Sequence, residues 1–412
     1  ILGLVSVKRK FIDREIVFKA NEIYNIDKID LSRKRIFDSG LFSSVEILPV
    51  IPKDSTAIVD INIKIREYKP SSIEADIGFS ELSAWQNNLL TPGLDVHGEW
   101  VIGNIMNTAS SFIISGGIAS EINLQSIEDK HNLLQLNAKL TYISPWTLKL
   151  KLPSTFNIFY EIDNVQTNKL NRLGISHKIY WEKSRSSYYE IKTTYQIINS
   201  DYDYNSQDEE PVRSIELSRT SKKVQNIIRP TGGHYFKFTG TVFGTILGGR
   251  RHFLKTTTEY RKYFKILKRG IIACRLKFGF IHNLNASDSL PNYYNFELGG
   301  QSSLRGWPSP QAFHHGKLAY DMVNFEYRFP IFKEWGGELF IDGGRLYNGI
   351  NGFNSSNFSW NYGAGITYDT TLGPVRLEYA IPFVGSNMNY ETIYENNYTK
   401  DGIFHVSLLY MF

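Results

Sequence analysis

The sequence predicts a mainly β fold, with a transmembrane barrel of about 16 antiparallel strands preceded by a small β-α-α-β-β domain. Three observations support this prediction. From Ser71 onward, helical periodicity disappears and about sixteen strand-like runs follow. The connections between these runs alternate in length. Residues 1–69 instead mix helical and strand periodicity, so we divide the chain into 1–69 and 70–412.

The composition leaves two classes of β protein open. Aromatic residues make up 14% of the 412 residues, yet mean hydropathy is −0.27. No apolar run approaches the roughly 18 residues of a transmembrane helix. A soluble β-rich protein has this composition, and so does a barrel whose strands are apolar only at alternate positions. The net charge is +5, with lysine and arginine scattered among acids, so we expect no nucleic-acid partner.

No pattern of residues in the sequence indicates a catalytic or metal-binding site. The single cysteine, Cys274, fits a small apolar position on a strand. The pair His314 and His315 is expected to be solvated. The motifs HExxH, GxSxG, CxxC and the P-loop are missing from the sequence. We therefore expect no catalytic residues, no metal and no cofactor. Because the chain opens at Ile1 without a methionine or a signal-like segment, we also expect sequence upstream.

The first 69 residues predict five elements in the order β-α-α-β-β. A short strand is expected over 4–8, and a helix starting at Asp13 with Ile16, Val17 and Ala20 on one face. A second helix follows Asn25, with Ile29, Arg33 and Phe37 on one face and Gly40 after its end. Strands are expected over 45–50 and 57–67.

This order, together with the segment from Arg35 to Ile47, resembles a POTRA domain, the periplasmic module of outer-membrane assembly factors. The pattern that carries the resemblance is a helix-ending glycine, an apolar residue, phenylalanine and then valine, here Gly40, Leu41, Phe42 and Val45. The same residues could simply cap a helix and fill a small core. The resemblance implies that the domain is the last of several.

The rest of the chain divides into sixteen expected strands. They lie near 72–80, 94–103, 109–119, 132–143, 155–165, 169–183, 187–199, 213–224, 232–245, 251–265, 270–281, 318–329, 336–343, 359–369, 373–382 and 402–412.

Alternation along these strands sorts the side chains onto two faces. In 270–281, Leu276 and Phe278 share an apolar face, while Arg275 and Lys277 share the other. A soluble sandwich alternates in the same way. A water-filled lumen, however, tolerates such a charged face, and short turns alternate here with loops as long as 282–317, which favours the outer-membrane arrangement. The N-terminal domain enters on the short-turn side.

The longest of these loops contains the most unusual stretch of the chain. It includes Gly299 and Gly300 and the tip Leu304, Arg305, Gly306 and Trp307. Glu326 and Asp342 face the lumen on the next two strands by parity. If the loop dips into the barrel, a guanidinium can pair with both carboxylates. From parity alone, an exposed loop arginine is the more frequent outcome.

The order of motifs from 296 to 412 resembles the BamA/TamA superfamily of outer-membrane assembly factors. The motifs are the loop tip, Glu326-Tyr-Arg-Phe-Pro330, Phe340-Ile-Asp-Gly-Gly344, Gly363-Ala-Gly-Ile366 with Gly373 to Ala380, and the terminal Phe412. The resemblance implies that Arg305 is the tip arginine of a loop folded into the lumen. It also implies that Glu326 and Asp342 are its partners. Whether the chain is of BamA or TamA type stays open, with the compact loops leaning to TamA.

The resemblance further implies a lateral seam where the first and last strands meet. Its residues are Ile73, Ala75, Ile77 and Phe79 on the first strand and Val406, Leu408, Tyr410 and Phe412 on the last. A weakly closed seam can expose backbone N–H and C=O groups to an incoming strand.

The implied function is assistance in inserting and folding outer-membrane barrels, without covalent chemistry. The implied location is the bacterial outer membrane, with the POTRA domain in the periplasm. The expected partners are nascent outer-membrane proteins, periplasmic or lipoprotein accessory subunits, and the lipid bilayer. Two alternatives share the architecture, a two-partner secretion transporter and the barrel half of a secreted patatin-like enzyme. A passive porin is a third candidate, which the POTRA-like segment disfavours.

Overall fold

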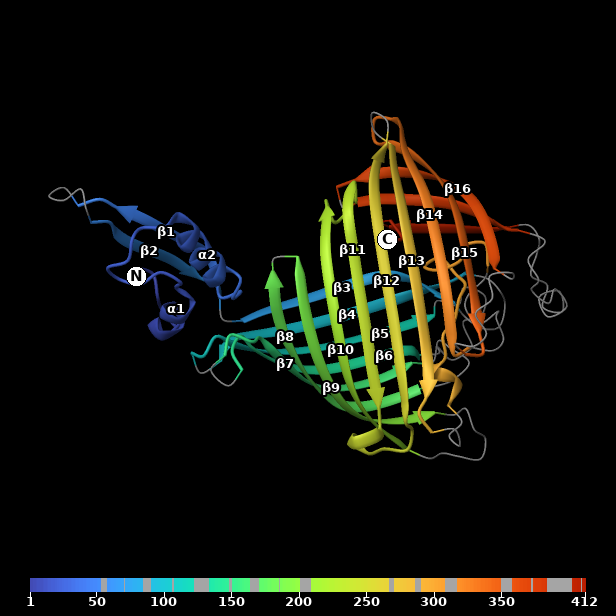
Figure 1. Cartoon of the computed structure of the whole chain (residues 1–412), viewed down its shortest axis with the longest axis horizontal. Coiled ribbons are helices and arrows are strands. Elements are labelled where there is room, and N and C mark those ends of the chain that lie inside the picture. The colour runs from blue at the N-terminus through green and yellow to red at the C-terminus, as the bar shows by residue number, and fades with distance from the viewer. Residues whose placement is uncertain are drawn as a thin grey trace.

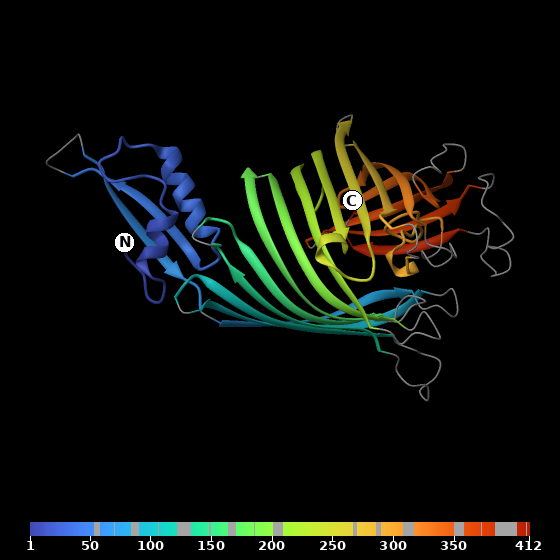
Figure 2. The ribbon, with the colours of Figure 1, turned by 60° about the horizontal axis from the view of Figure 1, so that its bottom comes forward.

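The structure is a computed structural model in which β-strands dominate. It describes residues 1–52, 58–69, 71–83, 90–105, 107–121, 133–147, 150–163, 170–184, 186–200, 209–266, 270–285, 290–307, 317–349, 358–371, 373–383, 402–408 and 410–412. Figure 1 shows a small N-terminal unit (residues 1–69) beside a large curved sheet, and Figure 2 shows the same arrangement from another side.

The large sheet contains sixteen strands in chain order, each antiparallel to its neighbours. They are β3 (Ser71–Ser83), β4 (Leu90–Ile105), β5 (Ser110–Glu121), β6 (Leu133–Ser144), β7 (Ser154–Asp163), β8 (Leu170–Ser184), β9 (Ser187–Ser200), β10 (Glu210–Gln225), β11 (Gly232–Phe243), β12 (Phe253–Ile266), β13 (Gly270–Asn283), β14 (Ala319–Phe332), β15 (Trp335–Tyr347), β16 (Ser359–Thr370), β17 (Gly373–Pro382) and β18 (Ile403–Leu408). The mainly β, sixteen-stranded prediction is confirmed, and every expected run corresponds to one strand.

Alternate residues of the strands face opposite sides of the barrel wall. On β13, Leu276 is 50% exposed while its neighbour Arg275 is 2% exposed. On β14, Phe325 points outward between the buried side chains of Asn324 and Glu326. An apolar exterior around a polar interior is the pattern of a transmembrane barrel.

The last strand is shorter than expected. The sequence predicts a strand over 402–412, but β18 ends at Leu408 and pairs only with β17 among the described strands. Beyond it, Phe412 is buried and contacts side chains of the lumen. Interactions with the interior therefore outweigh continued strand pairing at this end.

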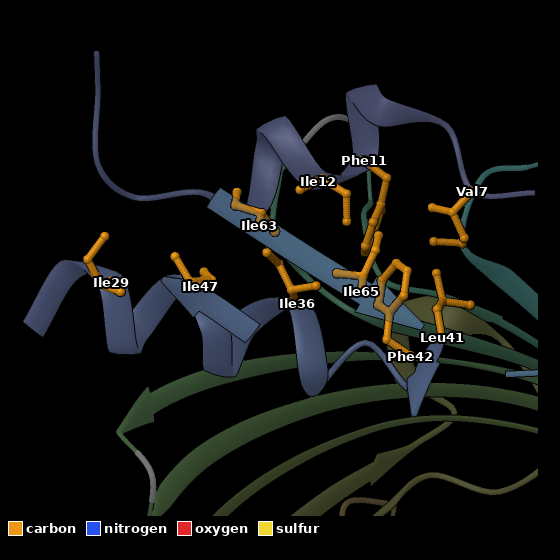
Figure 3. Close-up of a cluster of buried hydrophobic side chains, with 11 residues drawn as sticks. Val7, Phe11, Ile12, Ile29, Ile36, Leu41, Phe42, Ile47, Ile63 and Ile65 are labelled. Carbon is orange, nitrogen blue, oxygen red and sulfur yellow. The ribbon is translucent and has the colours of Figure 1, made fainter. Parts of the chain in front are cut away.

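The N-terminal unit contains two helices over a two-stranded sheet. They are α1 (Arg9–Glu15), α2 (Ile26–Phe37), β1 (Phe42–Val50) and β2 (Asp60–Glu67). Figure 3 shows their shared core, in which Phe11, Ile36 and Phe42 meet. Asn25 caps α2 by accepting from the backbone N–H groups of Asp27 and Lys28. No helix within the described residues is long and apolar enough to cross a membrane.

Two local predictions for this unit are wrong. The first helix lies at 9–15 rather than beginning at Asp13, because Phe11 and Ile12 are the residues that reach the core. The expected strand over 4–8 does not form, and the nearest pairing is a single bridge between Leu2 and Lys64. Its backbone N–H groups at Val5 and Val7 instead donate to the Glu67 carboxylate, at 2.8 and 3.0 Å.

The second helix differs from its prediction in the face that it buries. Ile29 and Ile36 are in the core as the periodicity indicates, but Phe37 is largely exposed and Ser32 is buried. The Ser32 hydroxyl accepts from the Val17 N–H at 2.9 Å and donates to the Lys28 carbonyl at 2.7 Å. These two hydrogen bonds allow a polar residue in the core.

The N-terminal unit contacts the barrel through the turn between β6 and β7. The Trp146 indole N–H donates to Glu15 Oε1 at 3.0 Å, and Lys151 forms an ion pair with the same carboxylate. The Arg14 guanidinium carbon lies 3.7 Å from the centre of the Trp146 ring. Ala109, in the turn between β4 and β5, joins the core cluster of the unit. The short turns of the barrel therefore lie at the end that faces the N-terminal unit.

Candidate functional site

The loop between β13 and β14 folds back on itself before it enters the barrel. Phe296 and Lys317 form a backbone bridge at its base. Further along, the Gly300 N–H donates to the Trp307 carbonyl at 3.0 Å, which closes the tip. Gly299 and Gly300 have φ values of 121° and 76°, a region that favours glycine. The glycine pair thus provides the reversal that the tip requires.

Apolar side chains hold the tip against the barrel wall. Leu298, Leu304 and Trp307 are buried with Met322 of β14. Gly306 lies so close to β16 and β17 that an added Cβ would be 2.5 Å from the Asn361 Cβ and 3.0 Å from the Ile381 backbone. Burying three large side chains supplies several kcal/mol of favourable transfer free energy, at about 1.5–3 kcal/mol each.

This packing delivers Arg305 to a group of three carboxylates in the lumen. Its Nε and Nη2 donate to Asp342 Oδ2 and Oδ1 at 2.9 and 2.7 Å, a bidentate pair. Its Nη1 donates to Glu326 Oε1 at 2.7 Å and to Glu378 Oε1 at 2.6 Å. The side chains of all four residues are fully buried. The guanidinium also stacks on Phe340, with 3.5 Å from Cζ to the ring centre.

Two asparagines donate further hydrogen bonds to the Asp342 carboxylate. Asn324 Nδ2 donates to Asp342 Oδ1 at 2.8 Å, and Asn361 Nδ2 donates to Oδ2 at 2.9 Å. Asn324 also donates to the Ser303 carbonyl at 2.8 Å. Arg275 fixes the preceding residue, since its Nη2 donates to the Ser302 carbonyl at 2.7 Å. Backbone and side chain of the tip are therefore both held by strand residues.

A second set of charges surrounds the first. Arg328 pairs with Glu326 Oε2 at 2.5 Å, and Arg376 lies 3.4 Å from Glu338 and 3.3 Å from Glu378. Glu326, Glu338, Asp342 and Glu378 thus face the buried Arg275, Arg305, Arg328 and Arg376. Buried charges persist when opposite charges and hydrogen bonds compensate them, which is the arrangement here.

The loop tip also contacts the last strand. His405 Nε2 of β18 lies 2.8 Å from the Arg305 carbonyl oxygen, and Gln301 Nε2 donates to the Val406 carbonyl at 3.3 Å. Since β18 has only six residues and a neighbour on one side, these contacts add to its attachment. The tip therefore links the lumenal network to one edge of the sheet.

The expected seam residues divide into two groups in the structure. Ile73, Ala75 and Ile77 on β3 and Val406 on β18 are exposed, with Ile73 and Ile77 at 78% and 75%. The side chains of Phe79 and Leu408 lie outside the described part of the chain. β3 pairs with β4 and β18 with β17, and the order of the described strands ends at these two edges.

Tyr410 and Phe412 do not lie on the outer face that the alternating pattern indicates. The Arg328 guanidinium carbon is 3.8 Å from the centre of the Tyr410 ring, and Arg328 Nη2 donates to the Phe412 carbonyl at 3.0 Å. Phe412 also packs with Tyr263 and Ala273. Contacts with lumenal arginines replace the expected lipid-facing positions, because β18 ends before these residues.

Parity alone found part of the network around the tip. The structure brings Arg305 together with Glu326 and Asp342, the two carboxylates on the adjacent strands. It also adds Glu378, whose inward position on β17 follows from the same alternation. Nothing in the sequence spacing links β17 to the tip or His405 to the Arg305 carbonyl, because these contacts depend on the curvature of the barrel.

Together, the fold and the tip define a class of protein: a small N-terminal α/β unit joined to a sixteen-stranded barrel with a loop inserted into its lumen. A model of the Omp85 superfamily domain matches residues 85–405. A model of the POTRA repeat, described as a surface antigen variable number repeat, matches residues 1–68. The chain belongs to the Omp85 superfamily.

Solved structures show the same fold at low sequence identity. The crystal structure of BamA from Haemophilus ducreyi lacking POTRA domains 1–3 has a TM-score of 0.73 and 16% identity, covering 97% of this chain and 81% of that one. CdiB from Acinetobacter baumannii has a TM-score of 0.57 and 12% identity, covering 100% and 73%. CdiB from Escherichia coli has a TM-score of 0.56 and 13% identity, covering 92% and 70%. The recognised BamA/TamA-type architecture is therefore confirmed.

Proposed function

We propose that this protein is an outer-membrane assembly factor that assists the insertion and folding of β-barrel proteins through the seam between β3 and β18. The observation that carries the proposal is the edge at β18. This strand is six residues long and pairs on one side only among the described strands. Unpaired backbone groups at such an edge can template an incoming strand. The proposed role involves no covalent chemistry, so the proposal is of a protein without enzyme activity.

The lumenal network supports the proposal because it holds the strands near the β18 edge in place. The bidentate contact of Arg305 with Asp342, and its contacts with Glu326 and Glu378, hold the loop on β14, β15 and β17. The tip also contacts β18 through His405. A rigid wall next to a weakly paired strand allows opening at the seam without unfolding of the barrel.

The proposal includes a location, a domain division and partners. The barrel (70–412) would span the outer membrane, and the POTRA domain (1–69), which follows the short-turn side, would lie in the periplasm. Nascent outer-membrane proteins would meet the seam. Periplasmic or lipoprotein accessory subunits would bind the POTRA domain. The likeness to BamA, with the higher TM-score, supports this choice.

A two-partner secretion transporter is the second candidate. The likeness to the two CdiB structures, at TM-scores of 0.57 and 0.56, supports it. Such a transporter would pass a polypeptide through the lumen, beside the tip around Arg305, which is held against β14, β15 and β17. The barrel half of a patatin-like enzyme has no comparable supporting observation here.

The seam can be tested by cross-linking its two strands. Cys274 is replaced by serine, Ile77 and Val406 are replaced by cysteine, and a flexible bismaleimide bridges them. Insertion of a reporter barrel protein into proteoliposomes should fall to the level without protein when the bridge forms. Unchanged insertion would contradict the seam mechanism.

The matched control bridges two adjacent strands far from the seam. Ile191 of β9 and Leu217 of β10 are register partners on the outer face. The same reagent on the Ile191→Cys/Leu217→Cys pair should leave insertion at the level of the unmodified protein. If secretion of a polypeptide is supported instead of insertion, the transporter is the better description.

A further inference from the structure

The outer face of β8 to β12 carries a charge of one sign only. Its outward-facing charged residues are all cationic: Arg213, Arg219, Lys223 and Lys262. A further cation, the exposed Lys183, lies at the irregularity that ends the pairing of β8 with β9. The acidic residues of the same strands stand at lumen-facing parity: Glu182, Glu190, Glu210, Glu216 and Glu259. The lipid-facing surface of a membrane barrel normally lacks charged residues. A group of cations on this surface, with no acidic residues beside them, therefore requires an explanation.

Arg219 stands among aromatic rings on this face. Its guanidinium carbon lies 5.8 Å from the centre of the Tyr189 ring and 6.0 Å from that of Phe236. Trp181 packs against Tyr189 at 5.6 Å between ring centres and is 58% exposed. Aromatic rings that flank a long cationic side chain are typical of the interface between lipid tails and headgroups.

The patch lies at the end of the barrel that faces the N-terminal unit. Arg219 is the register partner of Tyr189, which is two residues from the start of β9. Lys34 of α2 lies 3.9 Å from Glu182, the residue between Trp181 and Lys183. β10 and β11 are the two central strands in the order from β3 to β18, so the patch is on the wall opposite the seam.

Lys183, Arg219 and Lys223 are exposed, and none of them forms an ion pair with a carboxylate in the described part of the chain. An arginine on the exterior of a barrel is costly at the middle of the membrane, and this cost nearly vanishes near the interface. A phosphate at headgroup depth would compensate Arg219 and its neighbours, since guanidinium binds phosphate through paired hydrogen bonds.

We propose that the patch formed by Trp181, Lys183, Tyr189, Arg219, Lys223 and Phe236 binds the phosphate of an anionic phospholipid headgroup in the leaflet facing the N-terminal unit. The aromatic rings would contact the glycerol and upper acyl chains, and the cations would contact the phosphate. Binding would anchor the wall opposite the seam to the membrane surface. The inference requires a membrane-embedded barrel but not a particular substrate of the seam.

Native mass spectrometry of the full chain tests this proposal. The protein is released from micelles after incubation with equal amounts of phosphatidylglycerol and phosphatidylcholine. The wild type should retain phosphatidylglycerol in preference, and this preference should fall as salt concentration rises. Arg219→Gln/Lys223→Gln should bind phosphatidylglycerol about tenfold or more weakly, because each cation near an anionic surface contributes a factor of about five.

Lys192→Gln/Lys237→Gln is the matched control, because it removes the same charge from the lumenal face of β9 and β11. It should bind lipid as the wild type does. Equal loss in both double variants, or retention of the preference in Arg219→Gln/Lys223→Gln, would overturn the proposal. So would displacement of the lipid by excess inorganic phosphate, which would identify a free-anion site instead.

A double variant that fails to fold would be recognised by loss of its heat-dependent shift on an electrophoresis gel. In that case, the proposal is tested by how lipid binding to the wild type depends on the headgroup and on salt concentration. A wild type that binds phosphatidylglycerol and phosphatidylcholine equally would rule out an anionic lipid site.

Discussion

The site at position 305 requires the geometry of an arginine side chain. The guanidinium reaches Asp342 with two parallel hydrogen bonds and still contacts Glu326 and Glu378 through its remaining nitrogen. A lysine ammonium carries the same charge, but it cannot form the planar bidentate contact. The site therefore selects the shape of arginine as well as its charge.

Arg305→Ala should destabilise the folded barrel by about 3–5 kcal/mol, because it leaves three buried carboxylates without their shared cation. Arg305→Lys should lose part of this amount. The free energy of unfolding in urea, followed by tryptophan fluorescence in micelles, measures both effects. Arg172→Ala provides the control, since its contact with Glu161 at 3.4 Å is partly exposed and should contribute at most about 1 kcal/mol.

A double-mutant cycle separates pairing from general disruption. Asp342→Ala should cost less in the Arg305→Ala background than in the wild type, because the two side chains interact directly. Additive costs would show that the contact contributes nothing specific, and the role assigned to the tip would then fail.

At the scale of elements, the conformation of the N-terminal segment before α1 depends on a single carboxylate, that of Glu67. Burial raises the pKa of Glu67, but the Ser6 hydroxyl and the backbone N–H groups of Val5, Val7 and Ser6 outweigh this effect and lower the pKa below its usual value. A lowered pKa in the folded state means that the contact stabilises the fold when Glu67 is ionised. This contribution is lost as pH falls through the folded-state pKa.

Protection of the Val5 to Val7 amides from hydrogen exchange should accordingly be lost as pH falls below the usual glutamate pKa of about 4.3 and through the lowered pKa of Glu67. Exchange measured by mass spectrometry, corrected for intrinsic rates, gives this profile. Glu67→Gln should show weaker protection with no pH step. An identical pH step in Glu67→Gln would assign the effect to another group.

At the scale of the whole molecule, a few side chains set the position of the N-terminal unit on the barrel. The Glu15 carboxylate is buried and bound by Trp146 and Lys151, and Arg14 covers the same indole. The side chains of Lys34 and Glu182, by contrast, are partly exposed and lie 3.9 Å apart. The turn between β6 and β7 is thus the main polar contact between the two parts.

Glu15→Gln/Trp146→Phe should loosen the orientation of the N-terminal unit, because it removes the ion pair with Lys151 and the indole hydrogen bond. In a Cys274→Ser background, spin labels at Arg33 and Leu217 report the distance between the two parts. The distance distribution should broaden clearly in this variant and remain narrow in Lys34→Ala. Equal distributions in all three proteins would place the main contact elsewhere.

The sequence by itself determined the strands, their faces and the inward position of key charges. Period-two alternation is a local property, so it places Glu326, Asp342 and Glu378 on the lumenal side without knowledge of the barrel. The connection lengths likewise indicated which end meets the N-terminal unit. The loop-tip motif and its order along the chain indicated the family.

Only the tertiary structure decided which of these residues meet. Barrel curvature brings Glu378 of β17 to a loop that follows β13, and it places His405 at the Arg305 carbonyl. Tyr410 and Phe412 lie inside the barrel, although the alternation of apolar residues along the end of the chain indicates the outer face. They contact Arg328 where continued strand pairing was expected. Glu67 similarly replaces a strand partner for Val5 to Val7. Local periodicity assigns faces, whereas long-range contacts depend on how the sheet curves in space.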